Sequence, residues 1–201
     1  MNKTFPRVGW IQGEWGSIDK LSIPLSDRGL NLGDGIFETI LILNGQPQLL
    51  NNHLRRWRHS AHRLRMLEPP NENFLMTLIS EGISRAKLKG SNGSIRINWS
   101  RGDTLRRGID IDRDISPQSK NYRFWLEINP GGPFFEEISV NISELETRNT
   151  KSQISQCKTF GYSQSILAKD EAKLKGFDDA LLLNNKGSIC CGSSANLIIK
   201  R

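Results

Sequence analysis

The sequence predicts an α+β protein with two domains. Short segments of alternating apolar and polar residues, typical of strands, occur near both ends of the chain, and longer amphipathic patterns typical of helices lie among them. Pro130-Gly-Gly-Pro133 has the composition of a linker, and 201 residues are enough for one large or two small domains. We therefore expect a first domain at residues 1–129, a linker at 130–137 and a second domain at 138–201.

The first fifty residues have the pattern of an antiparallel β structure. Residues 6–15 alternate around Gln12-Gly13, which indicates a short hairpin. Gly29, Gly33 and Gly35, three glycines in seven positions, predict a sharply turning loop. Apolar and β-branched residues then predict a strand at Ile36–Leu43, an Asn44-Gly45 turn and a return strand at Gln48–Leu50.

Two helices and two strands complete the predicted first domain. Asn52 has the character of an N-cap for a helix whose apolar face holds Leu54, Trp57, Ala61 and Leu64. After Pro69-Pro70 a second amphipathic helix is expected at Asn71–Leu88. Strands at Ser94–Ser100 and Asn121–Asn129 follow, separated by a polar loop at Thr104–Ser116 that suits either substrate contacts or solvent exposure.

The second domain begins with a predicted strand at Ile138–Ile142. A helical pattern ends near Gly176, a position that favours a left-handed backbone. A buried strand at Asp179–Leu183, a turn at residues 185–187 and a last strand at Asn196–Ile199 complete the expected elements.

Charge and cysteine content exclude several kinds of protein. The net charge is +7, but the basic residues are scattered outside residues 55–65 and no nucleic-acid motif is present, so a small anionic ligand fits better than a nucleic acid. No apolar run is long enough for a membrane span, and no leader segment is visible, so we expect a cytoplasmic protein. The three cysteines and three histidines have no metal-binding spacing; we expect no metal, with the side chains of Cys190 and Cys191 on opposite faces of a strand.

Lys158 is the candidate for covalent chemistry. It lies in a loop before a helix, between Cys157 and Thr159-Phe160, at the edge of a segment that looks buried. A lysine amine in a partly desolvated setting loses its proton more readily and can attack a carbonyl group. A solvated surface lysine is the alternative.

Three motifs resemble those of the class IV aminotransferase family, the fold-type IV enzymes that use pyridoxal 5'-phosphate. They are Lys158-Thr-x-x-Tyr162, Gly192-Ser-Ser-x-Asn196, and the segment that runs from Asp27-Arg-Gly to Gly33-Asp-Gly-x-Phe-Glu-Thr39. The resemblance implies a two-domain fold like that of D-amino-acid aminotransferase. It also implies a homodimer and a small amino-acid-like substrate.

The resemblance also assigns roles to individual residues. Lys158 forms the Schiff base with the cofactor and moves the α-proton, and Tyr162 lies near the phenolic oxygen of the cofactor. Arg56 is in the family pattern His53-x-x-Arg56 and binds the phosphate. Ser194 and Asn196 lie in the cofactor-binding motif. For Arg56 a solvated basic helix face, and for Tyr162 a core position, are the structural alternatives.

Arg96 and Arg101 are our candidates for binding a substrate carboxylate, because the guanidinium fork matches a carboxylate group. A surface position on a strand and a cap on a loop are the alternatives.

Cys191 is the main departure from the family pattern. A family glutamate at this position pairs with the pyridine nitrogen of the cofactor, whereas a thiol is mostly neutral at pH 7 and is a weak partner. A weaker electron sink favours a reaction with its own driving force, and we expect a 4-amino-4-deoxychorismate lyase that yields p-aminobenzoate and pyruvate for folate biosynthesis. A branched-chain or D-amino-acid aminotransferase is the alternative, and Cys191 also fits as a small buried residue.

The sequence ends earlier than the family pattern does. Family members continue beyond Asn196 with further strands and a phosphate-binding loop at a helix N-terminus, so we expect a truncated second domain. A truncated, non-catalytic relative that acts as a partner subunit is therefore a third hypothesis.

Overall fold

The computed structural model describes residues 5–103, 108–111, 122–133 and 136–200. The chain forms two compact units: Met1–Pro133 with Lys158–Phe160, and Phe134–Cys157 with Gly161–Arg201. The division falls within the expected linker at 130–137, of which residues 134–135 lie outside the described residues. The sequence predicts that all of residues 138–201 belong to the second domain, whereas the structure groups Lys158–Phe160 with the first unit.

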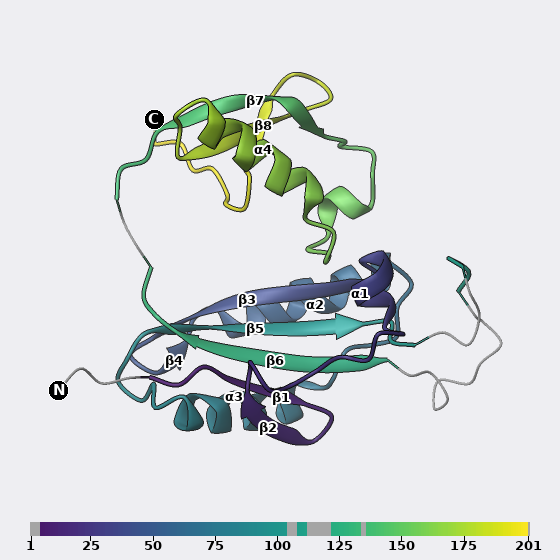
Figure 1. The fold of residues 1–201 in the computed structure, drawn as a ribbon, viewed down its shortest axis with the longest axis vertical. Helices are drawn as coiled ribbons and strands as arrows, with labels where there is room; N and C mark the ends of the chain where they lie inside the picture. The colour runs from purple at the N-terminus through teal and green to yellow at the C-terminus, as the bar shows by residue number, and fades with distance from the viewer. Residues whose placement is uncertain (1–4, 104–107, 112–121, 134–135, 201) are drawn as a thin grey trace. The chain divides into compact units, whose positions relative to one another are not determined.

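A six-stranded antiparallel sheet forms the first unit (Figure 1), with strand order β2-β1-β6-β5-β3-β4. Its strands are β1 (Val8–Ile11), β2 (Glu14–Ser17), β3 (Gly35–Leu43), β4 (Gln46–Pro47), β5 (Gly93–Ser100) and β6 (Arg123–Pro130). The predicted hairpin and the strands predicted at 36–43 and 94–100 are therefore confirmed. The strand predicted at 121–129 is confirmed for its described residues, and residue 121 lies outside them. Residues 104–107 and 112–116 of the predicted polar loop lie outside the described residues.

Helices α2 (Leu50–Arg63) and α3 (Glu72–Arg85) contribute to the core of this unit. Successive strand residues point to opposite faces, so Ile36, Ile40 and Ile42 of β3 meet the buried face of α2, which includes Leu54 and Trp57. The apolar face predicted for α2 is thus confirmed. The opposite face of β3, which includes Phe37, carries the candidate site.

Two predictions around α2 were wrong. The return strand is β4 at Gln46–Pro47 rather than Gln48–Leu50, and α2 begins at Leu50. Leu49 is the N-cap, with a left-handed φ of 51°, and Asn52 accepts a hydrogen bond from Arg55 instead of capping the helix. The left-handed turn at Leu49 redirects the chain from sheet to helix three residues earlier than the polar side chain of Asn52 suggested.

The glycine-rich loop contains a short helix, α1 (Arg28–Leu32), which the sequence analysis missed. Asp27 caps it: one carboxylate oxygen accepts hydrogen bonds from the backbone of Gly29 and Leu30, and from the Ser100 hydroxyl at 2.7 Å. The other oxygen pairs with Arg123, and both side chains are buried. Asp27 therefore joins α1, β5 and β6.

The second unit has the three-stranded sheet β7-β8-β9 and helix α4 (Ser163–Leu174). β7 (Val140–Arg148) is parallel to β8 (Asp179–Asn184), which pairs antiparallel with β9 (Ile189–Gly192). A small core of Ala168, Ala172, Ala180 and Leu182 joins α4 to the sheet. The predicted helix and the strand at 179–183 are confirmed, and Gly176 has the expected left-handed φ of 84°.

Glu171 of α4 fixes an irregularity in β7. Its carboxylate accepts a hydrogen bond from the Ser143 hydroxyl at 2.6 Å and from the backbone of Glu144 and Leu145, where the register with β8 shifts. The hydrogen bond from Lys175, followed by these contacts, lowers the pKa of Glu171 to about 2. The carboxylate is therefore ionised at neutral pH and holds the bulge to the helix.

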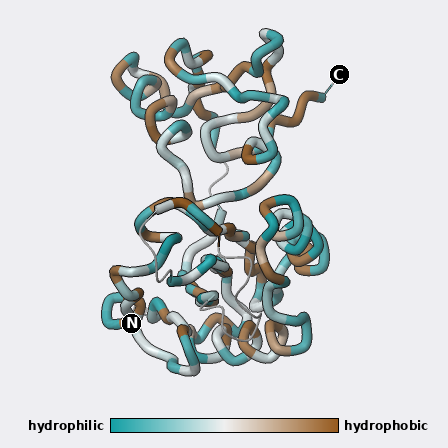
Figure 2. The backbone as a smooth tube through the Cα atoms, turned by 90° about the vertical axis from the view of Figure 1, so that its right-hand side faces the viewer, coloured by the Kyte–Doolittle hydropathy of each residue, from teal (hydrophilic) through white to brown (hydrophobic). Residues whose placement is uncertain are grey.

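The strand predicted at Asn196–Ile199 is wrong, because these residues have no regular structure. Ile198 and Ile199 are 91% and 75% exposed. They belong to the brown, hydrophobic segment beside the C label in Figure 2. The described chain gives this apolar run no partner strand, and apolar composition alone led to the wrong assignment.

The first unit provides a test of its buried ion pair. We expect Asp27→Ala to lower the free energy of unfolding of this unit by about 3–5 kcal/mol, because Arg123 is left buried without this partner. All five tryptophans lie in this unit, so urea unfolding followed by tryptophan fluorescence reports on it. Glu81→Ala, which removes an exposed pair with Arg85, is the control and should change stability by less than about 0.5 kcal/mol. Equal effects from both variants would contradict this role for Asp27.

Candidate active site

Lys158 lies in a short segment that pairs with strand β3. It follows the 3-10 helix η2 (Ile154–Gln156). The backbone N–H of Phe37 donates to the Lys158 carbonyl at 2.9 Å, and the N–H of Phe160 donates to the Gly35 carbonyl at 3.0 Å. Thr159 and Ile36 form an antiparallel bridge between these two bonds. Because Ile36 faces the helices, Lys158 and Phe160 lie with Phe37 on the other face of the sheet.

Lys158 and Arg96 both lie against the ring of Phe37. The Lys158 Nζ is 4.3 Å from the ring centroid, and the Arg96 Cζ is 3.6 Å from it. The Arg96 Nε donates to the Asn98 amide oxygen at 2.9 Å, which orients the guanidinium. Two cations at one aromatic ring suit a ligand that brings a carbonyl carbon to the amine and an anionic group to the guanidinium.

Arg56 is attached to the next residue of the same strand. Glu38 is fully buried; it accepts a hydrogen bond from the Arg56 Nε at 2.6 Å and a second from Nη2. The His53 Nδ1 lies 2.8 Å from the same carboxylate. The Arg56 side chain is half exposed. Strand β3 thus contacts three predicted residues: Lys158 and Arg96 lie on the face that carries Phe37, and Arg56 binds Glu38 on the helix-facing side.

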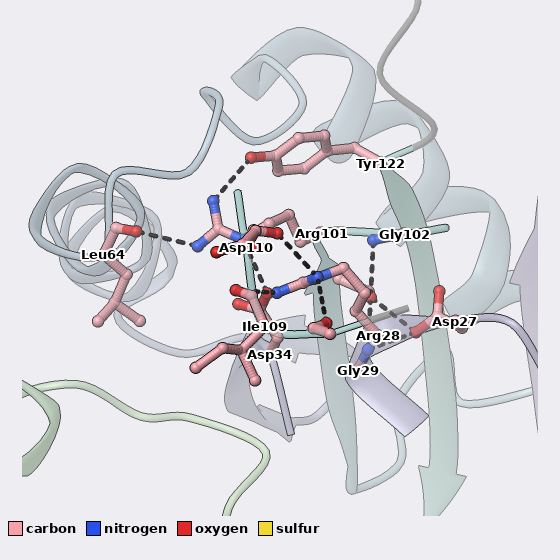
Figure 3. Close-up of polar contacts among 12 residues, drawn as sticks. Asp27, Arg28, Gly29, Asp34, Leu64, Arg101, Gly102, Ile109, Asp110 and Tyr122 are labelled. Atoms are coloured by element: carbon pink, nitrogen blue, oxygen red, sulfur yellow. Dashed lines mark hydrogen bonds and ion pairs between the residues drawn. The ribbon is translucent and has the colours of Figure 1, made fainter. Parts of the chain in front are cut away.

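Arg101 has a structural position instead of the predicted substrate role. Its side chain is buried, and four of its five N–H groups donate to Asp34, Tyr122 and the carbonyls of Leu64 and Arg65. Figure 3 shows this guanidinium among Leu64, Asp34 and Tyr122. We therefore withdraw Arg101 as a carboxylate-binding candidate. In the sequence Arg101 resembled a ligand contact because it follows a strand and its hydrogen-bond partners are not visible nearby in the chain.

The remaining predicted residues belong to the second unit. Tyr162 precedes α4 and is its N-cap residue; Cys191 is in β9, and exposed Ser194 and Asn196 follow it. The Gly192 N–H donates to the Ala195 carbonyl at 2.8 Å, which closes a tight turn across this motif. Ser193 is buried and donates to Asp179 at 2.5 Å, so the first serine of the pair is structural and the second is exposed.

Cys190 and Cys191 do not point to opposite faces as predicted. Their sulfur atoms are 3.8 Å apart, because the pairing of β8 with β9 shifts between Leu182 and Leu183. Cys191 packs against the small core of this unit. Burial, together with a hydrogen bond shared with Cys191, raises the pKa of Cys190. A one-residue bulge breaks the alternation that the prediction assumed.

Two kinds of site have no candidate among the residues that the structure describes. None of their His, Cys, Asp and Glu side chains form a group of three or more that could hold a metal ion. In the same part of the chain, no helix has both the length and the apolar character needed to cross a bilayer.

The family model for amino-transferase class IV matches residues 35–201, so the chain belongs to this family. An assigned branched-chain-amino-acid aminotransferase of Methanocaldococcus jannaschii is 26% identical over 193 residues, covering 94% of this chain and 64% of that protein. D-alanine aminotransferase of Listeria monocytogenes is 24% identical over 179 residues, covering 89% and 60%. The chain thus spans less than two thirds of the length of these relatives. The family resemblance predicted from the motifs is confirmed.

Solved structures show the same fold. The branched-chain amino acid aminotransferase of Escherichia coli has a TM-score of 0.80 and 20% identity, with 94% of this chain and 63% of that chain covered. An assigned 4-amino-4-deoxychorismate lyase of Legionella pneumophila has a TM-score of 0.74 and 21% identity, with 87% and 61% covered. The predicted fold-type IV architecture is confirmed, and class IV aminotransferases are pyridoxal-phosphate enzymes.

The sequence analysis missed the roles of Phe37 and Glu38. Both were noted only as part of a motif, although a glutamate at a helix-facing position of an apolar strand signals a buried charge that needs a cationic partner. The partners come from α2, fifteen and eighteen residues later in the chain. Their identity depends on how the helix packs on the sheet.

Glu38 predicts a pH dependence of stability. Burial raises its pKa, but hydrogen bonds from Arg56 and His53 outweigh burial and lower it below 4.5. A lowered pKa contributes stability that is present above pH 4.5 and is lost as the pH falls through the folded-state value. We expect Glu38→Gln to cost about 2 kcal/mol at pH 7 and to reduce the loss of stability below pH 4.5.

Urea unfolding of the first unit between pH 3 and pH 7 measures both effects, because this range lies on both sides of the ordinary glutamate pKa of 4.5. Glu81→Gln, which changes an exposed carboxylate of the same unit, is the matched control. Parallel stability curves for the wild type and Glu38→Gln would contradict the assigned role of Glu38.

Proposed function

We propose that this chain carries the lysine-bearing part of a pyridoxal-phosphate site that acts on an α-amino carboxylate. The observation that carries the proposal is the placement of the Lys158 amine and the Arg96 guanidinium against one ring, that of Phe37. An amine suits the cofactor aldehyde, and a guanidinium suits a carboxylate. The amine and the guanidinium of the first unit therefore suit the cofactor and the substrate class, respectively.

The residues divide the work by their chemistry. When bound, pyridoxal phosphate supplies an electron sink for charge that develops on the carbon next to the substrate nitrogen. Lys158 holds the cofactor by its Nζ and, once released, carries a proton at the same atom. Arg96, oriented by Asn98, binds the substrate carboxylate. Arg56, with two donors fixed by Glu38 and a half-exposed side chain, binds the phosphate.

Transamination is the reaction that we favour. The matched curated relatives reported above are named as aminotransferases for branched-chain amino acids and D-alanine. Their names support an amino-acid substrate, and the length of this chain relative to theirs makes its own activity part of the proposal. Branched-chain and D-amino acids are therefore the first substrates to test.

The lyase reaction is the second candidate, and Cys191 favours it. Cys191 lies in β9 and is partly buried, and the motif resemblance aligns it with the family glutamate. A thiol stabilises a protonated pyridine nitrogen less well than a carboxylate does, so it weakens the electron sink. Elimination from 4-amino-4-deoxychorismate yields an aromatic product and depends less on that sink. One structural neighbour assigned as such a lyase also supports this alternative.

Assembly and location belong to the same proposal. Family resemblance supports a homodimer, and the composition supports a cytoplasmic protein. A non-catalytic partner subunit is the alternative if the chain does not bind the cofactor.

The proposal predicts one modified lysine. Incubation with pyridoxal phosphate should give an absorbance band from the bound cofactor. Borohydride reduction and peptide mapping should then place a pyridoxyl group on Lys158, and Lys158→Ala should remove both the band and the adduct. Lys151→Ala, which changes an exposed lysine seven residues earlier, should keep both signals. The absence of an adduct on the wild-type chain would overturn the catalytic proposal and favour the non-catalytic partner subunit.

Cys191 provides a test of reaction type. We expect Cys191→Glu to raise the rate of amino-acid transamination by about tenfold or more, because a carboxylate keeps the pyridine nitrogen protonated. Initial rates with branched-chain and D-amino acids measure the change, and Cys190→Glu on the neighbouring residue is the control. Unchanged transamination in Cys191→Glu would contradict the argument that the thiol limits the electron sink.

A further inference from the structure

We propose that Phe160 is a positioning residue that holds Lys158 in place on strand β3. The catalytic meaning of this proposal rests on the function proposed for Lys158, but the placement itself does not. Phe160 is two residues from Lys158, on the same face of the paired segment, and its backbone N–H makes one of the two hydrogen bonds to β3. The side chain of Phe160 is larger than that of Lys158, and the sheet leaves a space for its ring, which we call the Phe160 seat.

Gly35 forms the floor of that seat. A Cβ atom at Gly35 would lie 2.1 Å from the Phe160 Cε2 and 2.5 Å from its Cδ2. A Cβ at Gly29 would lie 2.7 Å from the same Cε2. Neither glycine has the left-handed φ that would require glycine for backbone reasons. The absence of a side chain at Gly35 therefore makes room for the Phe160 ring.

Two aromatic rings form the sides of the seat. The Phe160 ring centroid is 5.4 Å from that of Trp125 in β6 and 6.3 Å from that of Phe37 in β3. These separations are within the range of stabilising aromatic pairs. Phe37 also carries the Lys158 amine against its ring. Phe160, Phe37 and Lys158 are therefore linked through direct contacts.

The ring supplies stabilisation that the backbone alone does not. The two backbone hydrogen bonds of the segment contribute less than the conformational entropy that is lost when three residues are ordered. Burial of an aromatic side chain adds a favourable contribution that depends on the seat being vacant. A lysine anchored two residues from this ring has few positions available to its amine, which favours one geometry for attack on an aldehyde.

Amide hydrogen exchange in the absence of cofactor tests the placement. NMR exchange rates at Phe37 and Phe160 report the two backbone bonds of the segment. Phe160→Ala and Gly35→Ala should each speed exchange at Phe37 by about tenfold or more, because the paired segment opens more often. The control is Phe74→Ala, which removes a partly exposed ring on α3 and should leave both rates unchanged. Unchanged exchange at Phe37 in Phe160→Ala would overturn the proposal.

A double-variant cycle removes the ambiguity of a folding defect. Gly35→Ala should have a large effect on exchange at Phe37 when Phe160 is present and less than about a twofold effect in the Phe160→Ala background, because no ring then competes for the space. Phe160→Leu should restore part of the protection, since it keeps an apolar side chain. Equal effects of Gly35→Ala in both backgrounds would overturn the claim that the Phe160 ring occupies the space at Gly35.

Cofactor addition then separates the two proposals. If the wild type forms the Lys158 adduct, Phe160→Ala should slow its formation by about tenfold and change the pH dependence of its absorbance, with partial rescue by Phe160→Leu. An unchanged rate and pH profile would overturn the positioning role. The third outcome is that the effect of Gly35→Ala on exchange depends on Phe160 but the wild type forms no adduct. This result would overturn the proposed function and leave the placement of Lys158 by Phe160 intact.

Discussion

Two backbone hydrogen bonds between β3 and Lys158–Phe160 are the constraint on which the candidate site depends. They join Gly35 and Phe37 to a segment more than 120 residues later in the chain and bring Lys158 into the first unit. Without them, the lysine would belong to a connecting loop. With them, its amine shares the ring of Phe37 with Arg96. The chemistry proposed for the chain follows from this local strand pairing.

The alternation of β3 separates two kinds of work. Residues that face the helices form the core, and among them Glu38 is a buried anion that fixes Arg56 and His53. Phe37, which faces the other way, organises the two cations of the candidate site. A shift of one residue in the register of β3 would exchange these environments and place Glu38 on the face that carries Phe37. The antiparallel pairing with β5 over eight residue pairs holds that register.

The sequence predicted most of the elements and the family, because hydrophobic periodicity and short motifs are local. It failed where the outcome depends on distant partners. Arg101 resembled a ligand contact but donates to Asp34, Tyr122 and two carbonyls. Cys190 and Cys191 fall at a bulge that depends on pairing with β8. Glu38 and Phe160 were missed because their partners lie on α2 and on Gly35, which only the folded chain brings close.

The most direct test of the central claim is the chemical environment of the Lys158 amine in the chain without cofactor. Reductive methylation with carbon-13 followed by NMR gives one methyl signal for each modified lysine. Because Lys158 Nζ lies 4.3 Å from the Phe37 ring centroid, its signal should be displaced from those of exposed lysines by the aromatic ring current. Phe37→Leu should return it to the common position. A Lys158 signal that coincides with exposed lysines in the wild type would contradict the account.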